Sequence, residues 1–491
     1  MISVPEAGGT DTAGDLAVFR QRFYDCLTAR ADALFELTDA VLCADGPVRS
    51  LPGLSLVAEH RRGHGALYDA LAAGRVDVDR LRDAVVSVPL PRAADGRIVL
   101  AVDVTCWLRP EAHTVPQRVL CHTYGRAKDT HIGVPGWPFS FVVALETGRT
   151  SWTALLDAVR LVPGADLAAI TAAQIEAVIG RLTTAGHWRP GDRKIWVVMD
   201  AGYDAARLAW LLRDLPVRVL ARMRADRVLR RPSPAWIPRP HGGRKPRHGG
   251  EFVFGDEASW GVPDVDTTTP TRLYGLAHAR AWRRLHPKLT RRAAWEDSLE
   301  LPVLEGTVIR LEVERLPSGA TAKPVWLWSP TTNSDHDDDA DMVDLLWQAF
   351  LRRFDIEHTF RLLKQTLGWT LPKLRDPAAA DRWTWLIIAA HTQLRLARPH
   401  AEDLRRPWEQ PAQPERLTPA RVRRAFRHLR ATTGTPATAP KPTRPGPGRP
   451  PGRPNQHPTH RHPVHTTTSN ETAKTASRKK KSTNPRPRRT G

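Results

Sequence analysis

Two apolar runs that carry aspartates constrain the fold of this chain most strongly. The first, RIVLAVDVTCWLR at residues 97–109, is rich in β-branched and apolar residues, which is typical of a buried strand. Asp103 interrupts it, and a buried carboxylate is costly unless it is paired or binds a metal. A capping or turn aspartate is the structural alternative, but this one has apolar residues on both sides. We therefore interpret Asp103 as a candidate functional residue.

The second run, KIWVVMDAGYDAARLAWLLRDL at residues 194–215, reads as strand, turn and helix. The strand IWVVM ends at Asp200, and the carboxyl end of a strand in an α/β protein faces the crevice where ligands bind. Asp204 directly precedes the helical pattern and is expected to cap it. Asp200 has no such structural explanation and is the second candidate functional residue. Further strands are predicted at FSFVVALE and GRTSWTALL, and a helix at residues 166–185.

A third acid lies in FLRRFDIEHTFRLLKQTLGW, residues 350–369, for which we predict one helix running to about Leu367. Arg353, Glu357, Arg361 and Lys364 are spaced so that they share one face of such a helix. Taken alone, this pattern favours a solvated stripe of ion pairs. The alternative is a carboxylate aimed at a site that the rest of the chain assembles.

Residues 230–331 contain many prolines and glycines and several short β-like runs, which predict a β-rich insertion. Within it, HARAWRRLHPKLTRR is strongly basic around Trp282. This combination suits phosphate contact with base stacking, but a partly exposed strand with solvated charges would have the same pattern. Both interpretations remain open at this point.

The net charge of +21 favours a polyanionic partner, most often a nucleic acid. Residues 421–491 hold 18 Lys and Arg and one acid, so they carry +17 of this charge. RLTPARVRRAFRHLR at residues 416–430 indicates a short basic helix. After it few residues can form a core, and we predict a largely disordered basic tail. Its Gly-Arg-Pro segments at Arg449 and Arg453 resemble the AT-hook, which lies in the minor groove of A·T-rich DNA.

Four scattered cysteines indicate a reducing, cytoplasmic location without a disulfide framework. The sequence also shows neither a secretory signal nor an apolar run long enough to cross a membrane. Two strand aspartates and one helix glutamate that converge would suit Mg²⁺, which prefers oxygen ligands. Two such ions can clamp the attacking and leaving oxygens of a phosphoryl displacement.

In these motifs the chain resembles the DDE transposases of bacterial insertion sequences, in the branch whose ribonuclease H-like core is interrupted by a β-rich insertion. The signature of that branch is Tyr, two residues, Arg, three residues, Glu, six residues, Lys. Phe350, Arg353, Glu357 and Lys364 stand at this spacing, with Phe in place of Tyr. VDVTCW and VVMDAGYD match the segments of the first and second acids, and the resemblance spans about residues 102–369. The missing hydroxyl at Phe350 removes one possible phosphate contact and leaves the acids untouched.

The resemblance implies that Asp103, Asp200 and Glu357 are catalytic ligands of two Mg²⁺ or Mn²⁺ ions, and that Arg353 and Lys364 contact DNA. It further implies DNA partners, namely the element ends and the target, a homodimer in the synaptic complex, and a bacterial, nucleoid-associated location. The expected activity is metal-dependent cleavage at the ends and strand transfer into target DNA. Two alternatives remain: a ribonuclease H-like nuclease without strand transfer, and a non-catalytic, domesticated regulatory DNA-binding protein.

The predicted fold is therefore α/β, a ribonuclease H-like mixed sheet with flanking helices. We divide the chain into a helical N-terminal segment with possible DNA-binding function, a first core segment, the β-rich insertion, a second core segment with the Glu-bearing helix, and the basic tail. Their respective boundaries are residues 1–95, 96–229, 230–331, 332–403 and 404–491.

Overall fold

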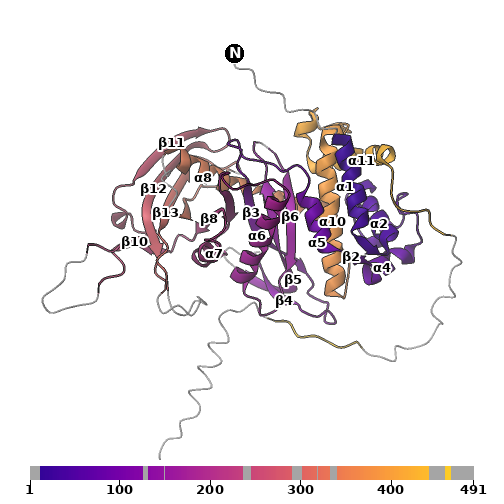
Figure 1. Cartoon of the computed structure of the whole chain (residues 1–491), viewed down its shortest axis with the longest axis horizontal. Helices are drawn as coiled ribbons and strands as arrows, with labels where there is room; N and C mark the ends of the chain where they lie inside the picture. The colour runs from indigo at the N-terminus through magenta and orange to yellow at the C-terminus, as the bar shows by residue number, and fades with distance from the viewer. Residues whose placement is uncertain are drawn as a thin grey trace, which may run out of the picture.

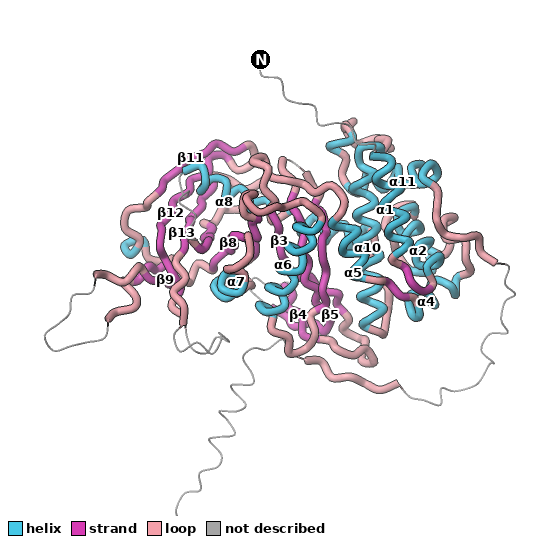
Figure 2. Tube along the Cα trace, in the orientation of Figure 1, coloured by secondary structure: helices cyan, strands magenta, loops and turns pink. Residues whose placement is uncertain are grey.

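The computed structural model describes residues 12–124, 131–148, 150–235, 245–289, 301–317, 319–331, 340–441 and 459–465. A β-rich part, a central part with sheet and helices, and a helical part lie side by side along the long axis (Figure 1). Figure 2 shows the same division by secondary structure. Within the described ranges, no helix is long and apolar enough to cross a membrane.

The central part is a mixed sheet. β7 lies between β3 and β8 and is parallel to both, while β5 pairs antiparallel with β3, β4 and β6. All five residues of β7 are buried, as its uninterrupted apolar run predicts. The prediction missed β4, whose short sequence VLCHTY mixes polar and apolar residues. The strands are β3 (Val99–Leu108), β4 (Val119–Tyr124), β5 (His131–Leu145), β6 (Thr153–Arg160), β7 (Ile195–Met199) and β8 (Val217–Met223).

Among the helices that pack on this sheet are α6 (Leu167–Thr184) and α7 (Ala205–Leu211), and each of these begins at a capping aspartate. Asp204 accepts a hydrogen bond from the backbone N–H of Arg207, which confirms its predicted capping role. α6 packs against β5 and β6, and α7 packs against β8 (Figure 1). Asp200 and Asp204 thus have different tasks although only four residues separate them.

The β-rich part continues the same sheet, because β14 pairs antiparallel with β8. In the described residues, twelve strands therefore form one sheet that runs through both parts. The segment predicted as an insertion is connected to the core by a short ladder in which Trp326, Leu327 and Trp328 pair with Met223, Arg222 and Ala221. Its strands are β9 (Val228–Arg230), β10 (Glu251–Val253), β11 (Val265–Thr271), β12 (Gly275–Pro287), β13 (Gly306–Val313) and β14 (Val325–Pro330).

An aromatic cluster forms the centre of the β-rich part. Trp282 is only 2% exposed, and its ring packs edge-on against Phe252 with 5.2 Å between centroids. Trp260 and Trp326 complete the cluster around Trp282. The hypothesis that Trp282 stacks on a base is therefore wrong, because an aromatic ring must be accessible to stack on a ligand. Trp282 is instead a core residue of β12, although the residues on either side of it are basic.

The helical part is built from two segments that lie far apart in the sequence, residues 12–86 and 377–433. The N-terminal helices α1 and α2 pack against α10, and α11 packs against α10 and α2. In Figure 1 these indigo and orange helices stand beside one another. The elements are α1 (Thr12–Asp25), β1 (Leu27–Ala29), α2 (Ala31–Cys43), α3 (Leu51–Leu54), α4 (His64–Ala73), β2 (Arg75–Val76), α5 (Val78–Val86), α10 (Pro377–Ala397) and α11 (Pro419–Thr433).

α11 lies in the segment 404–491 and confirms the short basic helix that RLTPARVRRAFRHLR indicates. The helix is part of the core, because Val422 and Phe426 are fully buried. Its basic residues are also engaged: Arg427 Nε donates to Glu59 at 3.0 Å, and Arg423 Nε donates to the carbonyl of Val41 at 2.9 Å. These arginines contribute to the net positive charge of the tail, but in the folded chain they bind the N-terminal helices.

A short segment of the tail, residues 459–465, lies along the edge strand β4. Leu120 N donates to the carbonyl of His465, and His465 N donates to the carbonyl of Arg118, both at 2.9 Å. His462 N donates to the carbonyl of His113, also at 2.9 Å. The tail segment thus satisfies backbone groups of an edge strand that would otherwise be open to water.

We expect a chain truncated after Pro458 to exchange the amide hydrogen of Leu120 faster than the full chain, since the acceptor carbonyl of His465 is then missing. Hydrogen exchange read by mass spectrometry or NMR measures this effect. The amide of Leu100, in the interior strand β3, serves as the control and should keep its protection. Equal exchange of Leu120 in both chains would contradict the docking of the tail on β4.

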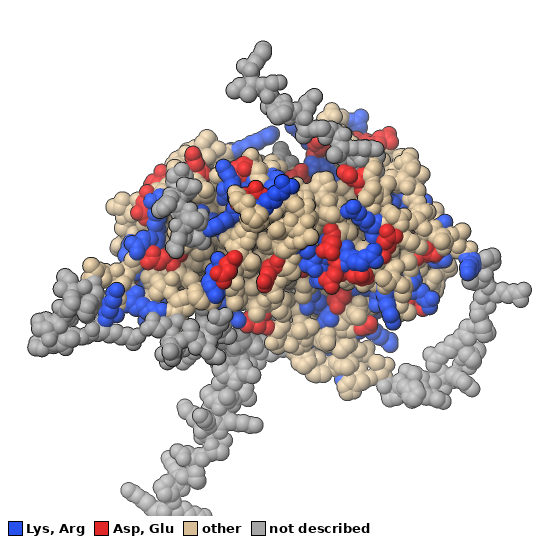
Figure 3. Space-filling model, viewed as in Figure 1, with Lys and Arg blue, Asp and Glu red and all other residues tan. Residues whose placement is uncertain are grey.

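Charge on the folded surface is mixed. The face shown in Figure 3 carries Lys and Arg interspersed with Asp and Glu. This pattern agrees with the sequence, in which residues 421–491 hold +17 of the net +21 and leave the rest of the chain nearly balanced.

Candidate active site

Two neighbouring parallel strands place the first two acids at the same edge of the sheet. Val102 in β3 is the register partner of Met199 in β7. Asp103 and Asp200 are the next residues after this pair, so they leave the paired region side by side. Neighbouring strands lie about 4.8 Å apart, which brings the two carboxylates to one crevice at the carboxyl end of the strands.

The third acid lies on a helix that is shorter than predicted. α8 (Ala340–Arg352) ends before Arg353, α9 (Asp355–Arg361) carries Glu357, and a π-helical turn (Leu362–Thr366) follows. The single helix that we predicted over this segment is therefore wrong. Arg353 and Phe354 form a break between the two helices. Here backbone N–H groups donate to the carbonyl three residues earlier, as in a 3₁₀ turn; for example, Glu357 N donates to the carbonyl of Phe354 at 3.1 Å.

The break decides which side chains share a surface. Arg353 is only 7% exposed, whereas Glu357 and Arg361 are exposed. Arg353 and Glu357 do share a face as predicted, because Arg353 Nη2 lies 3.5 Å from Glu357 Oε1, but the arginine is buried beneath the accessible glutamate.

The guanidinium of Arg353 contacts all three acids. Its Nη1 donates to Asp103 Oδ2 at 2.9 Å. Its Nη2 lies 3.7 Å from Asp200 Oδ2 and 3.5 Å from Glu357 Oε1. The structure thus gathers Asp103, Asp200 and Glu357, which stand far apart in the sequence, around one buried cation.

The electrostatics of Asp103 follow from this arrangement. Burial raises the pKa of Asp103 above its usual range, and the charge of Arg353 opposes this shift. The charges of Asp200 and Glu357 also raise the pKa of Asp103, to a smaller extent than burial does. Arg353, which contacts all three carboxylates, therefore offsets the repulsion among them.

Two further residues reach the site, and we had not proposed a role for either. Arg222 on β8 places its Nη1 3.6 Å from Asp200 Oδ1. Tyr203 follows Asp200 in the same turn, and burial, together with the charge of Asp103, raises the pKa of its hydroxyl well above its usual value. The sequence could have indicated Tyr203 as a site residue, because it lies in the turn that follows the strand-end Asp200. It could not have indicated Arg222, which comes close to Asp200 only through the pairing of β7 with β8.

The donor set fits a hard divalent cation, because it consists of carboxylate oxygens alone. In addition, Asp200 Oδ1 is buried and accepts no hydrogen bond in the described part of the chain. Within those residues, no three His, Cys, Asp or Glu side chains are already arranged as a metal site, and Arg353 contacts all three acids. The acids are thus suited to a metal by chemistry, and a metal would have to compete with the guanidinium.

Lys364 points towards β3. Its Nζ donates to Thr105 Oγ1 at 2.6 Å, and burial lowers the pKa of Lys364 below its usual value. Its DNA contact therefore stays a prediction, as does that of Arg353. Arg449 and Arg453, the other two residues predicted to bind DNA, lie outside the described residues.

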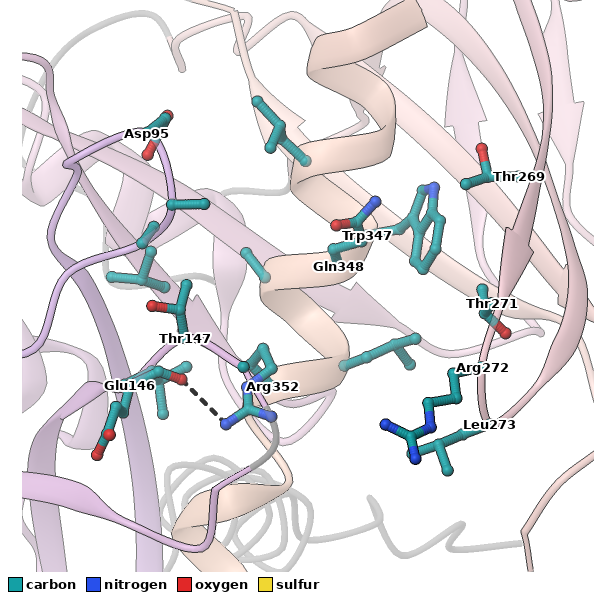
Figure 4. Close-up of a pocket in the computed structure, with 18 of the residues that line it drawn as sticks. Asp95, Glu146, Thr147, Thr269, Thr271, Arg272, Leu273, Trp347, Gln348 and Arg352 are labelled. Atoms are coloured by element: carbon teal, nitrogen blue, oxygen red, sulfur yellow. Dashed lines mark hydrogen bonds between the residues drawn. The ribbon is translucent and has the colours of Figure 1, made fainter. Parts of the chain in front are cut away.

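A cavity of about 460 Å³ lies at the other end of the same strands (Figure 4). Its walls include Val99 and Trp196 from the beginnings of β3 and β7, and Trp347 and Arg352 from α8. Figure 4 shows α8 passing through this region, with Arg352 hydrogen-bonded to the carbonyl of Glu146 at 2.9 Å. None of the three gathered acids lines the cavity, so it is separate from the acid site.

The DDE superfamily endonucleases match residues 22–288, more than half of the chain. The chain belongs to this family. The region that matches the DDE superfamily endonucleases contains Asp103 and Asp200 and ends before Glu357. The assignment of the third acid therefore rests on the signature spacing and on the geometry around Arg353.

Other comparisons add little to the family assignment. No curated protein matches the chain. Among solved structures, the chain is similar to the one described as "Cryo-EM structure of piggyBac transposase synaptic complex with hairpin DNA (SNHP)". This similarity has a TM-score of 0.39 and 10% sequence identity, and covers 88% of this chain and 73% of that chain.

Proposed function

We propose that this DDE superfamily endonuclease is the transposase of a bacterial insertion sequence. In this proposal it cleaves DNA at the ends of the element and joins the freed 3′ ends to target DNA. The observation that carries the proposal is the convergence of Asp103, Asp200 and Glu357 on one guanidinium, two from strand ends and one from a helix.

The order of the core strands supports the proposed ribonuclease H-like fold. β6, β5 and β3 are antiparallel neighbours, and β7 and β8 continue from β3 in parallel. A sheet of three antiparallel and two parallel strands with the acids at its crevice resembles the core of the transposases whose signature this chain shares.

Asp103, Asp200 and Glu357 would hold the metal, with two Mg²⁺ or Mn²⁺ ions as the proposed cofactors. When bound, such ions activate water and stabilise charge on the attacking and leaving oxygens of the phosphodiester. Tyr203, with its raised pKa, keeps its proton and can donate a hydrogen bond beside the acids. In the proposal, Arg353 and Lys364 contact the DNA backbone near the cleaved bond.

The proposed partners are element-end DNA, target DNA and a second copy of the chain that holds the other end. Arg449 and Arg453 would add minor-groove contacts of low sequence specificity from the tail. Because the phosphate contacts dominate such binding, its affinity should fall steeply with salt.

The test is the variant Asp200→Asn, which keeps the size of the side chain and removes its charge. We expect it to lose Mg²⁺-dependent nicking of an element-end duplex and the joined products, because a metal-binding carboxylate is missing. The control is Asp204→Asn, which should retain activity because asparagine also caps helices well.

The outcomes separate the proposed functions. Undiminished nicking by Asp200→Asn would reject the catalytic assignment. Metal-dependent nicking by the wild-type chain without joined products would favour a nuclease that lacks strand transfer. DNA binding with neither reaction would favour the non-catalytic regulator.

A further inference from the structure

Arg353 is more deeply buried than any of the acids it contacts. Its side chain is 9% exposed, compared with 22% for Asp103, 37% for Asp200 and 46% for Glu357. The carboxylates are therefore open to water on one side, while the guanidinium neutralises them from beneath. A cation that arrives from solvent meets the acids first and the arginine behind them.

The bonds of Asp103 show what such a cation must compete with. Its Oδ2 accepts from Arg353 at 2.9 Å, and its Oδ1 accepts from the backbone N–H of Val104 at 2.8 Å. Both oxygens of the deepest acid are thus already engaged, and the positive guanidinium would repel a second cation at the same carboxylates. Binding of a divalent ion to the acids is therefore opposed by the contacts of Arg353 with Asp103, Asp200 and Glu357.

The position of Arg353 in the backbone suits a residue that moves. It lies in the break between α8 and α9, where it is held by short-range bonds such as that from its N–H to the carbonyl of Phe350 at 3.0 Å. The end of α8 directly before it, including Ala349 and Arg352, lines the cavity of about 460 Å³ (Figure 4). This helix end therefore has free volume beside it, so the break can shift without first opening a close-packed core.

We propose that Arg353 is an exchangeable counter-ion of the acid site. It neutralises the three carboxylates while they hold no divalent cation, it leaves them when the site takes up the cation, and the freed guanidinium then binds a DNA phosphate. The inference rests on the proposed function, since it takes the acids as metal ligands. Its consequence is that one residue couples metal uptake to DNA contact, so that each favours the other.

The first test measures Mn²⁺ affinity without DNA, by calorimetry or by electron paramagnetic resonance of the free ion. We expect Arg353→Gln to bind Mn²⁺ more tightly than the wild type, by roughly 5- to 150-fold, the usual range of coupling between two binding events. Arg361→Gln is the matched control, because Arg361 is an exposed cation of the same segment. Unchanged or weaker binding by Arg353→Gln would overturn the proposal.

Two further variants keep the result interpretable. Arg353→Lys retains the positive charge and loses the fork of donors, so it should bind Mn²⁺ more tightly than the wild type, a result that does not depend on whether Arg353→Gln folds. Asp200→Asn should bind Mn²⁺ less tightly than the wild type. If it does not, the metal assignment of the proposed function fails; if it does while Arg353→Gln equals the wild type, only the counter-ion role fails.

The second test measures DNA affinity against salt, with a short duplex of arbitrary sequence, in either EDTA or Ca²⁺. With Ca²⁺, Arg353→Gln should reduce the slope of log affinity against log salt by about 0.9, which corresponds to one lost phosphate contact. In EDTA the same substitution should leave the slope unchanged, because the guanidinium is held by the acids. An equal loss of slope in both conditions would show a phosphate contact that is independent of the metal and would contradict the exchange.

Discussion

Replacing Glu357 with Gln should lower DNA cleavage by roughly 10²- to 10³-fold, the usual effect of removing one group that stabilises transition-state charge. The substitution keeps the shape of the side chain and removes its negative charge. Since Glu357 is nearly half exposed, the amide can be solvated and the chain should stay folded. Cleavage of a labelled element-end duplex in Mg²⁺ measures the effect.

This variant is informative because the family match ends at residue 288, well before the third acid. Glu176→Gln provides the matched control: it is the same substitution at an exposed position of α6, away from the acids. Full activity of Glu357→Gln would remove the helix glutamate from the site. Equal loss in both variants would point to a general effect of the substitution on the fold.

The largest expected effect on stability comes from Arg20 in α1, which connects the two ends of the chain. Its Nη1 donates to Asp39 Oδ1 at 2.8 Å and to Gln393 Oε1 at 2.6 Å, and all three side chains are buried. Arg20→Met should lower the free energy of unfolding by about 3–5 kcal/mol, because it leaves Asp39 buried with less compensation. Urea unfolding followed by circular dichroism measures the change.

Arg224→Met is the control for this experiment. Arg224 also pairs with an aspartate, Asp226, at 2.7 Å, but both side chains are more than 60% exposed. Exposed pairs contribute at most about 1 kcal/mol, so the two variants should differ clearly. Similar losses from both would show that the buried network does not hold α1 to α2 and α10.

The sequence predicts the positions of Asp103 and Asp200 relative to their strands well, because the pattern that identifies a buried strand lies within a few neighbouring residues. An uninterrupted apolar run such as IWVVM implies a buried strand, and the residue that follows it must lie at the sheet edge. The capping role of Asp204 is likewise encoded within four residues of chain. These features depend on neighbours in sequence and little else.

The features that the sequence did not reveal depend on distant contacts. Helical periodicity continues through Arg353, and the sequence does not show that its guanidinium is buried against Asp103 and Asp200 at the break between α8 and α9. The same holds for the partners of α11, since the sequence indicates a short basic helix but not that Glu59 and the carbonyl of Val41 bind its arginines. For Trp282 the sequence left two interpretations open for a related reason, since the flanking charges give no information about the aromatic cluster around it.

The central claim is that Asp103, Asp200 and Glu357 form one metal-binding centre that Arg353 occupies in the absence of metal. Anomalous diffraction at the manganese edge, from crystals of the full chain soaked in Mn²⁺, tests it most directly. We expect a peak about 2.0–2.2 Å from carboxylate oxygens of Asp103 and Asp200, the distance typical of oxygen ligands to small divalent cations, with the guanidinium of Arg353 withdrawn from them. Manganese bound elsewhere, or Arg353 still in contact with all three acids beside a bound ion, would contradict the account.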